Sequence, residues 1–394
     1  MASGRSTIIR PPPDDPNKAP IENVLEVTEL GVLGPVSDIQ QLRQVSFEMG
    51  HWSSLHSRTG HSFTRKHKLT PCQDIFTNTR QPWHPPGARG IFGGAVIAQC
   101  LASAQKTVPN DFFVHSCHCY FLLAGSSEIP ILFHVERVRD GRSFATRPPA
   151  GRCIFTTTVS FVKEGSGGEK QVRHAAPLPE GVRPPPADWK GEPEWNTHSP
   201  FQTYRISLVG ADEGKRLDEL KSRNWVRARG RISVSGGHQA HLNALAYMSD
   251  SYFIGTVGRI HKLWRFPFKP EEFADLPPEL REQVERLNEF EGNSDAGGME
   301  YWKTRPHLGM MVSLDHSIYF HEPRRVRADE WMFTEMESPW SGDGRGVVLQ
   351  KIFAGTGRFW RLASRRFVLL TDWVQGVIRL KQEEDEEKEP KSKL

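Results

Sequence analysis

The sequence predicts an α+β fold in which one unit, a helix followed by antiparallel strands, occurs twice. In the first half, segment 93–109 has small and apolar residues at helical spacing, and the strand-like segments 114–123, 129–147 and 153–162 follow it. In the second half, the apolar helix 241–257 precedes strand-like segments at 311–323, 330–338, 347–353 and 373–380. Both helices are too apolar to lie on a surface, so we expect each sheet to wrap around its own helix.

The chain of 394 residues is long enough for two domains of ordinary size. Glycine and proline are concentrated between the two repeats, which is typical of a linker. The predicted organisation is a flexible arm at 1–20, a first domain at 21–165 that contains an irregular insertion at 36–73, a linker at 166–205, a second domain at 206–380, and a charged tail at 381–394.

Composition narrows the classes of function. A net charge of +4 and a pI near 8.8 suit an anionic small ligand but are too weak to indicate nucleic acid as a partner. No apolar stretch has the length of a membrane span, so none is expected. The five cysteines follow a polar, proline-rich start without signal-peptide character, which favours reduced thiols in an intracellular compartment.

Several standard catalytic motifs are absent from the sequence: the nucleophile elbow G-x-S-x-G, the P-loop, a G-x-G-x-x-G that opens a helix, and H-E-x-x-H. The densest cluster of ligand-type residues is His115, Cys117 and Cys119, which alternation would put on one face of a strand. No second cysteine or histidine pair is spaced to complete a metal site. We therefore expect buried thiols with a hydrogen-bonded histidine, and neither a metal nor a cofactor.

Three polar residues stand out because apolar residues surround them. Asp250 ends an apolar helical run, Ser313 lies in the strand-like segment VSLDHSIYF, and Gln375 lies in the apolar segment WVQGVI. The ordinary alternatives are a helix cap for Asp250, a plain strand serine for Ser313 and an edge residue for Gln375. A carboxylate in apolar surroundings needs partners, and all three residues come from the second half. Together they predict a catalytic set.

The segments GIFGGAVIAQCLASAQKTVP, ALAYMSDSYF, SLDHSIYFH and WVQGVIRL resemble the type II acyl-coenzyme A thioesterase family, known in bacteria as TesB, and look most like its fungal peroxisomal members. The resemblance covers roughly residues 21–35, 73–163 and 225–380. It implies a double hot-dog fold, in which two sheets, each wrapped around a central helix, pair into one continuous sheet.

The resemblance also implies an activity, the hydrolysis of fatty acyl-CoA to free fatty acid and coenzyme A in fatty acid metabolism. In the family an aspartate, a serine or threonine and a glutamine bind and activate a water, and these match Asp250, Ser313 and Gln375. A carboxylate can act as the general base, while the hydroxyl and the amide orient the water. Backbone N–H groups at the start of a central helix are candidate donors to the oxyanion. We expect direct attack by water without an acyl-enzyme.

The sequence departs from the family pattern at the insertion 36–73, at 147–153, where Pro148 and Pro149 would interrupt a strand, and in a longer approach to Gln375. Two alternative functions stay open at this stage. One is an acyl-CoA-binding protein that has kept the fold and lost turnover. The other is a hot-dog enoyl-CoA hydratase, which would use a paired aspartate and histidine. Asp315 and His316 resemble such a pair, but neighbouring strand residues point to opposite faces.

The charged tail ends in Ser392, Lys393 and Leu394, a tripeptide that the peroxisomal import receptor reads as an address. The sequence therefore predicts the peroxisomal matrix as the location and the import receptor as a partner. The duplicated fold would supply a dimer-like sheet within one chain, so both a monomer and a homo-oligomer remain possible.

Overall fold

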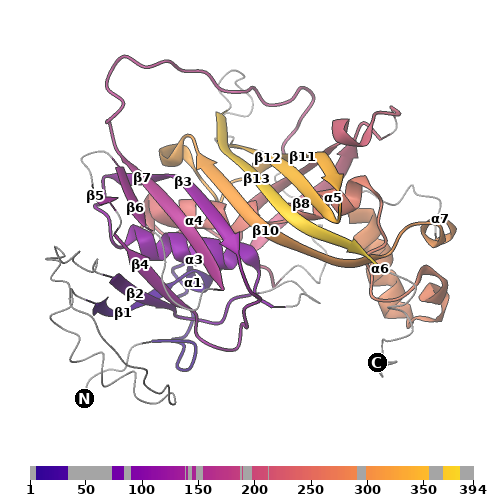
Figure 1. The fold of residues 1–394 in the computed structure, drawn as a ribbon, viewed down its shortest axis with the longest axis horizontal. Helices are drawn as coiled ribbons and strands as arrows, with labels where there is room; N and C mark the ends of the chain where they lie inside the picture. The colour runs from indigo at the N-terminus through magenta and orange to yellow at the C-terminus, as the bar shows by residue number, and fades with distance from the viewer. Residues whose placement is uncertain are drawn as a thin grey trace, which may run out of the picture.

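The computed structural model describes residues 6–33, 73–83, 90–137, 139–140, 144–147, 154–186, 189, 198–211, 213–290, 299–354 and 367–381. Residues 36–72 of the expected insertion and 382–394 of the expected tail lie outside these ranges, as do Pro148 and Pro149. Within them, the strands form one ten-stranded sheet and one three-stranded sheet, and every strand pair is antiparallel (Figure 1).

The first half supplies seven of the described strands, arranged around one long helix. Its elements in chain order are α1 (Pro20–Val24), β1 (Val27–Leu33), β2 (Gln73–Asn78), α3 (Gly93–Gln105), β3 (Phe112–Phe121), β4 (Leu132–Glu136), β5 (Arg139–Asp140), β6 (Phe144–Arg147) and β7 (Phe155–Lys163).

The second half repeats this order with longer strands and a longer connection after its helix. Its elements are β8 (Phe201–Val209), η4 (Leu217–Glu219), β9 (Lys221–Ala228), α4 (Gly237–Ser249), α5 (Gly255–Ile260), η5 (Pro270–Asp275), α6 (Pro278–Phe290), α7 (Met299–Lys303), β10 (Leu308–Phe320), η6 (Pro323–Arg325), β11 (Met332–Gly342), β12 (Arg345–Ala354) and β13 (Phe367–Leu380).

The strand order confirms the duplication. The large sheet runs β5-β6-β7-β3-β10-β13-β12-β11-β9-β8, and the small sheet runs β1-β2-β4. Since β4 and β5 follow each other in the chain, both halves have the same order outward from their first strand after the helix. Those two first strands, β3 and β10, pair at the centre, with Ile318 opposite Cys117. One continuous sheet therefore joins the halves, and the predicted double hot-dog fold is confirmed.

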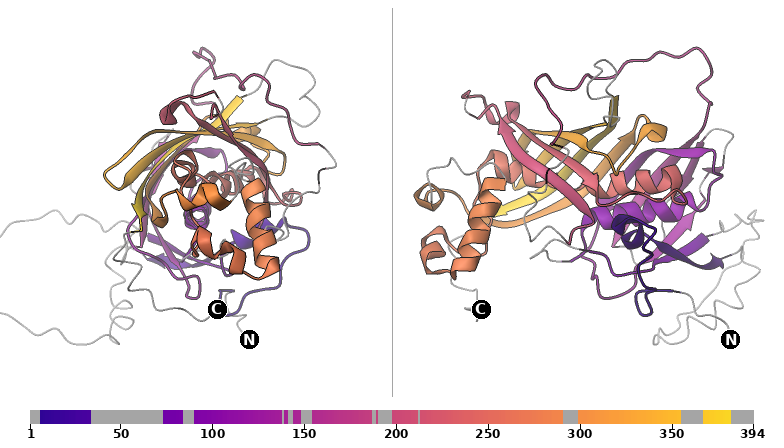
Figure 2. Two further views of the ribbon diagram at one scale, coloured as in Figure 1. Left: turned by 90° about the vertical axis from the view of Figure 1, so that its right-hand side faces the viewer. Right: turned by 180° about the vertical axis from the view of Figure 1, so that it is seen from behind.

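The sheets curve around the two long helices, which lie inside the curve (Figure 2). Helix α3 and helix α4 are mostly buried, and their apolar side chains share one core with strands of both halves. Contributors from the strands include Phe76, Phe133, Phe161, Ile318 and Ile352. Burial of so large an apolar surface is the main favourable term for folding. No helix among the described residues is long and apolar enough to span a membrane.

Glycine allows α3 and α4 to approach each other closely. A Cβ added at Gly94 would lie 2.3 Å from the backbone oxygen of Tyr247 in α4, so no larger residue fits without movement. The structure shows that, at Gly94, the close neighbour is the other central helix.

The expected helix 241–257 is two helices. Helix α4 ends at Ser249, and Tyr252 adopts a left-handed conformation with φ of 60°, so the chain turns before α5 begins at Gly255. Positive φ is uncommon for a bulky residue, and apolar periodicity alone does not reveal it. The hairpin between β11 and β12 turns at Asp343 and Gly344, which have φ of 51° and 66°.

The sequence reasoning did not predict β8, β9 or the helices of the connection 262–307. Strand β8 begins at Phe201, within the stretch expected to be linker. In the expected N-terminal arm, the backbone of Pro13 and the carboxylate of Asp14 both contact Arg80, which follows β2.

Replacing Gly94 with alanine tests the close approach of the two helices. The added methyl group must displace the α4 backbone, so we expect Gly94→Ala to lower the free energy of unfolding by about 1–3 kcal/mol in urea titration. Gly31→Ala is the matched control, because a Cβ there meets nothing within 4 Å, and its effect should stay below about 0.5 kcal/mol. Equal stability of the two variants would contradict the packing described above.

Candidate active site

The C-terminal end of α4 meets the N-terminal end of α3, and Asp250 lies at this junction. Asp250 is the C-cap residue of α4, and its Oδ2 accepts the backbone N–H of Gly94 at 2.9 Å. A carboxylate at the end of α4 faces the negative end of that helix dipole, which is unfavourable. The N-terminus of α3 offers the opposite field and an N–H group that has no acceptor within its own helix. The first half therefore stabilises a charged group of the second half.

His316 on β10 is the second neighbour of the Asp250 carboxylate. Its Nδ1 lies 3.5 Å from Oδ1 of Asp250, and the side chains are 0% and 10% exposed, respectively. The His316 ring also packs on Phe253, with centroids 5.0 Å apart. One oxygen of the carboxylate is thus held by α3 and the other faces an imidazole in a nearly dry environment, where electrostatic interactions are stronger than in water.

Ser313 lies on the same face of β10 as His316 because the strand contains a bulge. Ser313 pairs with Gly376 and Asp315 pairs with Gln375, so Leu314 is an extra residue in β10. Alternation without a bulge would put residues three apart on opposite faces. The bulge brings Ser313 to the inner face, which is the face that packs against the helices.

Gln375 does not join the other two predicted residues. A Cβ added at its neighbour Gly376 would lie 2.6 Å from the side chain of Ile254, so Gly376 faces inward, toward α5. Strand β13 has no bulge at this point, and alternation therefore turns the half-buried Gln375 to the outer face, opposite Asp315 and Val347. The strand register thus places Gln375 on the face opposite to Ser313, and a catalytic role for Gln375 stays a prediction. The residue that the register pairs with His316 is Val374.

Asp315 and His316 are adjacent, and the structure separates them as strand alternation requires. His316 is buried on the inner face, whereas Asp315 is half-buried beside Gln375. Burial raises the pKa of the Asp315 carboxyl, and the backbone N–H of Gln375 and the neighbouring His316 act in the opposite direction. The aspartate that faces His316 is instead Asp250.

Tyr247 forms a buried wall beside Asp250, one turn earlier on α4. Burial, and next the charge of Asp250, raise the pKa of Tyr247, so its hydroxyl stays protonated. The ring packs against Phe92, with centroids 4.9 Å apart, and against Phe201 at 6.0 Å. Within the described residues its hydroxyl has no hydrogen-bond partner, which leaves a polar atom in an otherwise apolar wall.

The cluster that resembled a metal site has other partners. His115 Nε2 lies 2.9 Å from the Ser160 hydroxyl, and Cys119 Sγ lies 3.3 Å from that of Thr157. Burial and the neighbouring His118 lower the pKa of His115. The part of the chain that the structure describes holds no group of three His, Cys, Asp or Glu residues suited to a metal ion.

Sequence reasoning missed two parts of this site. One is His316, which was weighed only together with its neighbour Asp315. The other is the N–H of Gly94, because all the candidate catalytic residues were sought in the second half. A glycine pair at the start of an apolar helix could have indicated the close approach, but nothing in the sequence names Asp250 as its partner.

Comparison with known proteins identifies the family. Residues 79–162 match the acyl-CoA thioesterase N-terminal domain family, and residues 177–362 match the acyl-CoA thioesterase C-terminal domain family. The chain is 32% identical to acyl-coenzyme A thioesterase 8 of Mus musculus, covering 81% of this chain and 89% of that protein. It is 23% identical to peroxisomal acyl-coenzyme A thioester hydrolase 1 of Saccharomyces cerevisiae, covering 71% and 85%.

Among solved structures, acyl-CoA thioesterase II TesB2 from Mycobacterium marinum matches with a TM-score of 0.51 and 26% identity, covering 78% of this chain and 93% of that one. Both domain families match in the order in which the two halves occur, and the duplicated fold agrees with them. The chain therefore belongs to the type II acyl-coenzyme A thioesterase family.

Proposed function

We propose that this protein hydrolyses fatty acyl-CoA to free fatty acid and coenzyme A by direct attack of a water that Asp250 activates. Membership of the family gives thioester hydrolysis of acyl-CoA as the reaction. The observation that carries the mechanism is the Asp250 carboxylate, which is held at the start of α3 and faces His316.

Thioester hydrolysis needs a water that loses a proton as it attacks the carbonyl carbon, and a fixed carboxylate can take that proton. Gly94 occupies Oδ2 of Asp250, which leaves Oδ1 and the remaining lone pairs for water. The Ser313 hydroxyl, on the same inner face as His316, would orient the attacking water. No side chain has to form a covalent acyl intermediate in this scheme.

The start of α3 also suits the negative charge that develops on the carbonyl oxygen. The N–H of Gly93, in the first turn, has no acceptor within its helix, and the helix dipole favours negative charge at this end. A Cβ at Gly93 would lie 2.7 Å from Oδ2 of Asp250 and 3.0 Å from the Phe121 ring. Glycine therefore lets the Asp250 carboxylate and the Phe121 ring lie close against the start of α3, and Phe121 offers an apolar surface for the acyl chain.

One assay separates hydrolysis from binding without turnover and from hydration of an enoyl-CoA. Thiol release from saturated and enoyl-CoA substrates, followed with a thiol reagent, is expected for a thioesterase. Loss of the enoyl absorbance without thiol would indicate a hydratase, and neither signal would indicate a binding protein.

Substitution of Asp250 is the sharpest test of the base. We expect Asp250→Asn to lower kcat by about 10²–10⁴-fold, since general-base catalysis contributes that much, while acyl-CoA binding persists in calorimetry.

Asp315→Asn is the matched control, because Asp315 lies on the outer face of β10, opposite to the face that carries His316. Because the pKa of Asp315 is raised in the folded protein, the protein loses stability as pH rises through that pKa and the carboxyl becomes charged. Asp315→Asn should remove this pH-dependent loss and keep kcat within about twofold. An Asp250→Asn variant with wild-type turnover would exclude Asp250 as the base.

Ser313 and Gln375 should respond differently, because the strand register puts them on opposite faces. We expect Ser313→Ala to lower kcat about tenfold, the value of one hydrogen bond that orients the water. Gln375→Ala should leave kcat within about twofold. A large loss in Gln375→Ala together with an unchanged Ser313→Ala would contradict the observed register.

We propose in addition that the protein is imported into the peroxisome. The sequence Ser392-Lys393-Leu394 supports this location, and so does the name of the yeast relative. A fluorescent protein fused to the N-terminus should colocalise with a peroxisomal marker. Removal of the tripeptide should leave the fusion in the cytosol, whereas Lys391→Ala should not alter its location. Peroxisomal fluorescence without the tripeptide would contradict the proposed route.

A further inference from the structure

The two halves differ most in the connection from the central helix to the next strand. In the first half, residues 106–111 join α3 to β3, whereas residues 250–307 join α4 to β10 in the second half. This long connection contains α5, η5, α6 and α7 and lies at one end of the molecule (Figure 1). Trp264 anchors it, since its backbone N–H donates to Pro306 and its carbonyl accepts from Leu308.

An aromatic cluster surrounds this anchor. Trp264 is 1% exposed, and its ring packs against Phe266, Phe268 and Trp302 with centroids 4.9, 5.6 and 5.7 Å apart. Tyr301 lies against Trp302. The connection is thus a small packed unit with its own apolar centre.

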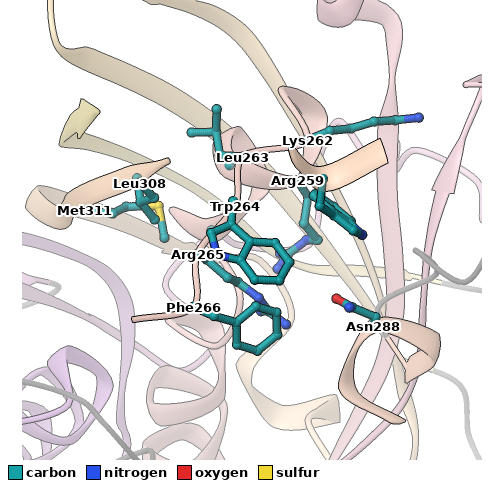
Figure 3. A pocket seen from close by; sticks show the side chains of 12 residues that line it. Arg259, Lys262, Leu263, Trp264, Arg265, Phe266, Asn288, Leu308 and Met311 are labelled. Atoms are coloured by element: carbon teal, nitrogen blue, oxygen red, sulfur yellow. The ribbon is translucent and has the colours of Figure 1, made fainter. Parts of the chain in front are cut away.

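A cavity of about 60 Å³ lies between α5, this cluster and the beginning of β10. We call it the basic cavity, because three cations and no carboxylate line it among the described residues. Figure 3 shows Trp264 at its centre with Arg259 and Arg265 close by. Its lining residues are Gly255, Gly258, Arg259, Lys262, Leu263, Trp264, Arg265, Phe266, Asn288, Trp302, Leu308 and Met311.

The side chains of the basic cavity suit a phosphate next to a flat ring. Arg259 donates to the Tyr252 carbonyl and lies 3.4 Å from the Thr256 hydroxyl, so its guanidinium is held in place. Arg265 is exposed and lies over the Phe266 ring at 5.1 Å. Guanidinium groups bind phosphate oxygens in pairs, and aromatic rings stack on bases. The volume exceeds several times the roughly 10–15 Å³ that a single water needs.

The basic cavity is connected to the proposed catalytic site by a single strand face. Met311 lines the cavity and shares the inner face of β10 with Ser313, because no bulge separates them. From Met311 to His316 the strand advances about 16 Å at a rise of roughly 3.3 Å per residue. The pantetheine arm between the thioester sulfur and the phosphates of coenzyme A is long and flexible enough to span such a distance.

We propose that the basic cavity binds the 3′-phosphorylated adenosine diphosphate end of the acyl-CoA substrate, with its phosphates on Arg259 and Arg265 and its adenine at the rim, beside the partly exposed Phe266 ring. This inference rests on the proposed function. The same chemistry would also bind a free nucleotide or inorganic phosphate as an effector, so the experiment must separate a substrate subsite from an effector site.

Truncated substrates make this distinction. Acyl-pantetheine carries the thioester and the arm but no adenosine phosphates. Arg265→Glu is the preferred variant, since an exposed side chain can change without disturbing the core, and Lys262→Glu is the second. Each should raise KM for acyl-CoA about tenfold, the effect of one charge-assisted hydrogen bond, with kcat within twofold. Their kcat/KM for acyl-pantetheine should equal that of the wild type.

Lys269→Glu is the matched control, an exposed cation in the same connection that does not line the basic cavity. Lys269→Glu should leave kcat and KM unchanged for both acyl-CoA and acyl-pantetheine. Equal losses on acyl-CoA and acyl-pantetheine, or no loss on acyl-CoA in either variant, would overturn the proposal.

Direct binding separates the subsite from an effector site and does not need turnover. Adenosine 3′,5′-bisphosphate should bind the wild type in calorimetry, compete with acyl-CoA, and bind Arg265→Glu about tenfold more weakly. Activation or inhibition of acyl-pantetheine hydrolysis by the bisphosphate or by inorganic phosphate would indicate an effector site and refute a substrate subsite. If the wild type released no thiol, the proposed function would fail, while calorimetry with coenzyme A would still decide whether the cavity binds it.

Discussion

The hydrogen bond from the Gly94 N–H to the Asp250 carboxylate joins the two halves at the point where the chemistry is proposed. It requires the end of α4 to touch the beginning of α3, and that approach requires glycine, because a Cβ at Gly94 would collide with the Tyr247 backbone. It also requires the halves to share one sheet, since the pairing of β3 with β10 brings the two helices side by side. The site therefore forms only when both halves of the duplicated fold are present.

This contact changes the division of roles between the halves. The sequence predicts that the second half carries all three candidate catalytic side chains. In the structure, the second half supplies Asp250, Ser313 and His316, but the electrostatic support of the carboxylate comes from the first half. A carboxylate at a helix C-terminus is unfavourable by itself, so a second half folded alone would hold Asp250 in an unfavourable field. The small first half is indispensable for that reason.

Periodicity predicted the duplicated α+β unit, because helical and strand spacing distinguish α3, α4, β3 and β10 in the sequence, and the resemblance to the family supplied the pairing of the two sheets. Periodicity failed where the backbone departs from regular geometry. The left-handed Tyr252 divides one apolar run into two helices, and the bulge at Leu314 brings Ser313 and His316 to one face. Side chains alternate with a period of two, so a shift of one residue reverses the face. Gln375 illustrates this: its residue type and neighbourhood fit the family pattern, but its register turns it outward.

The same backbone irregularities link catalysis to recognition. Tyr252 turns the chain just after Asp250 caps α4, and its carbonyl accepts a hydrogen bond from the guanidinium of Arg259 in the basic cavity. The bulge that brings Ser313 inward leaves Met311 on the same face, at the edge of that cavity. Residues 250–266 and the first part of β10 thus border both places. If the cavity holds the adenosine phosphates, the binding energy of this remote end is available to position the thioester at Asp250. Binding energy that is equal in the ground state and the transition state lowers KM and leaves kcat unchanged, so the long connection would serve substrate capture in the half that carries the base.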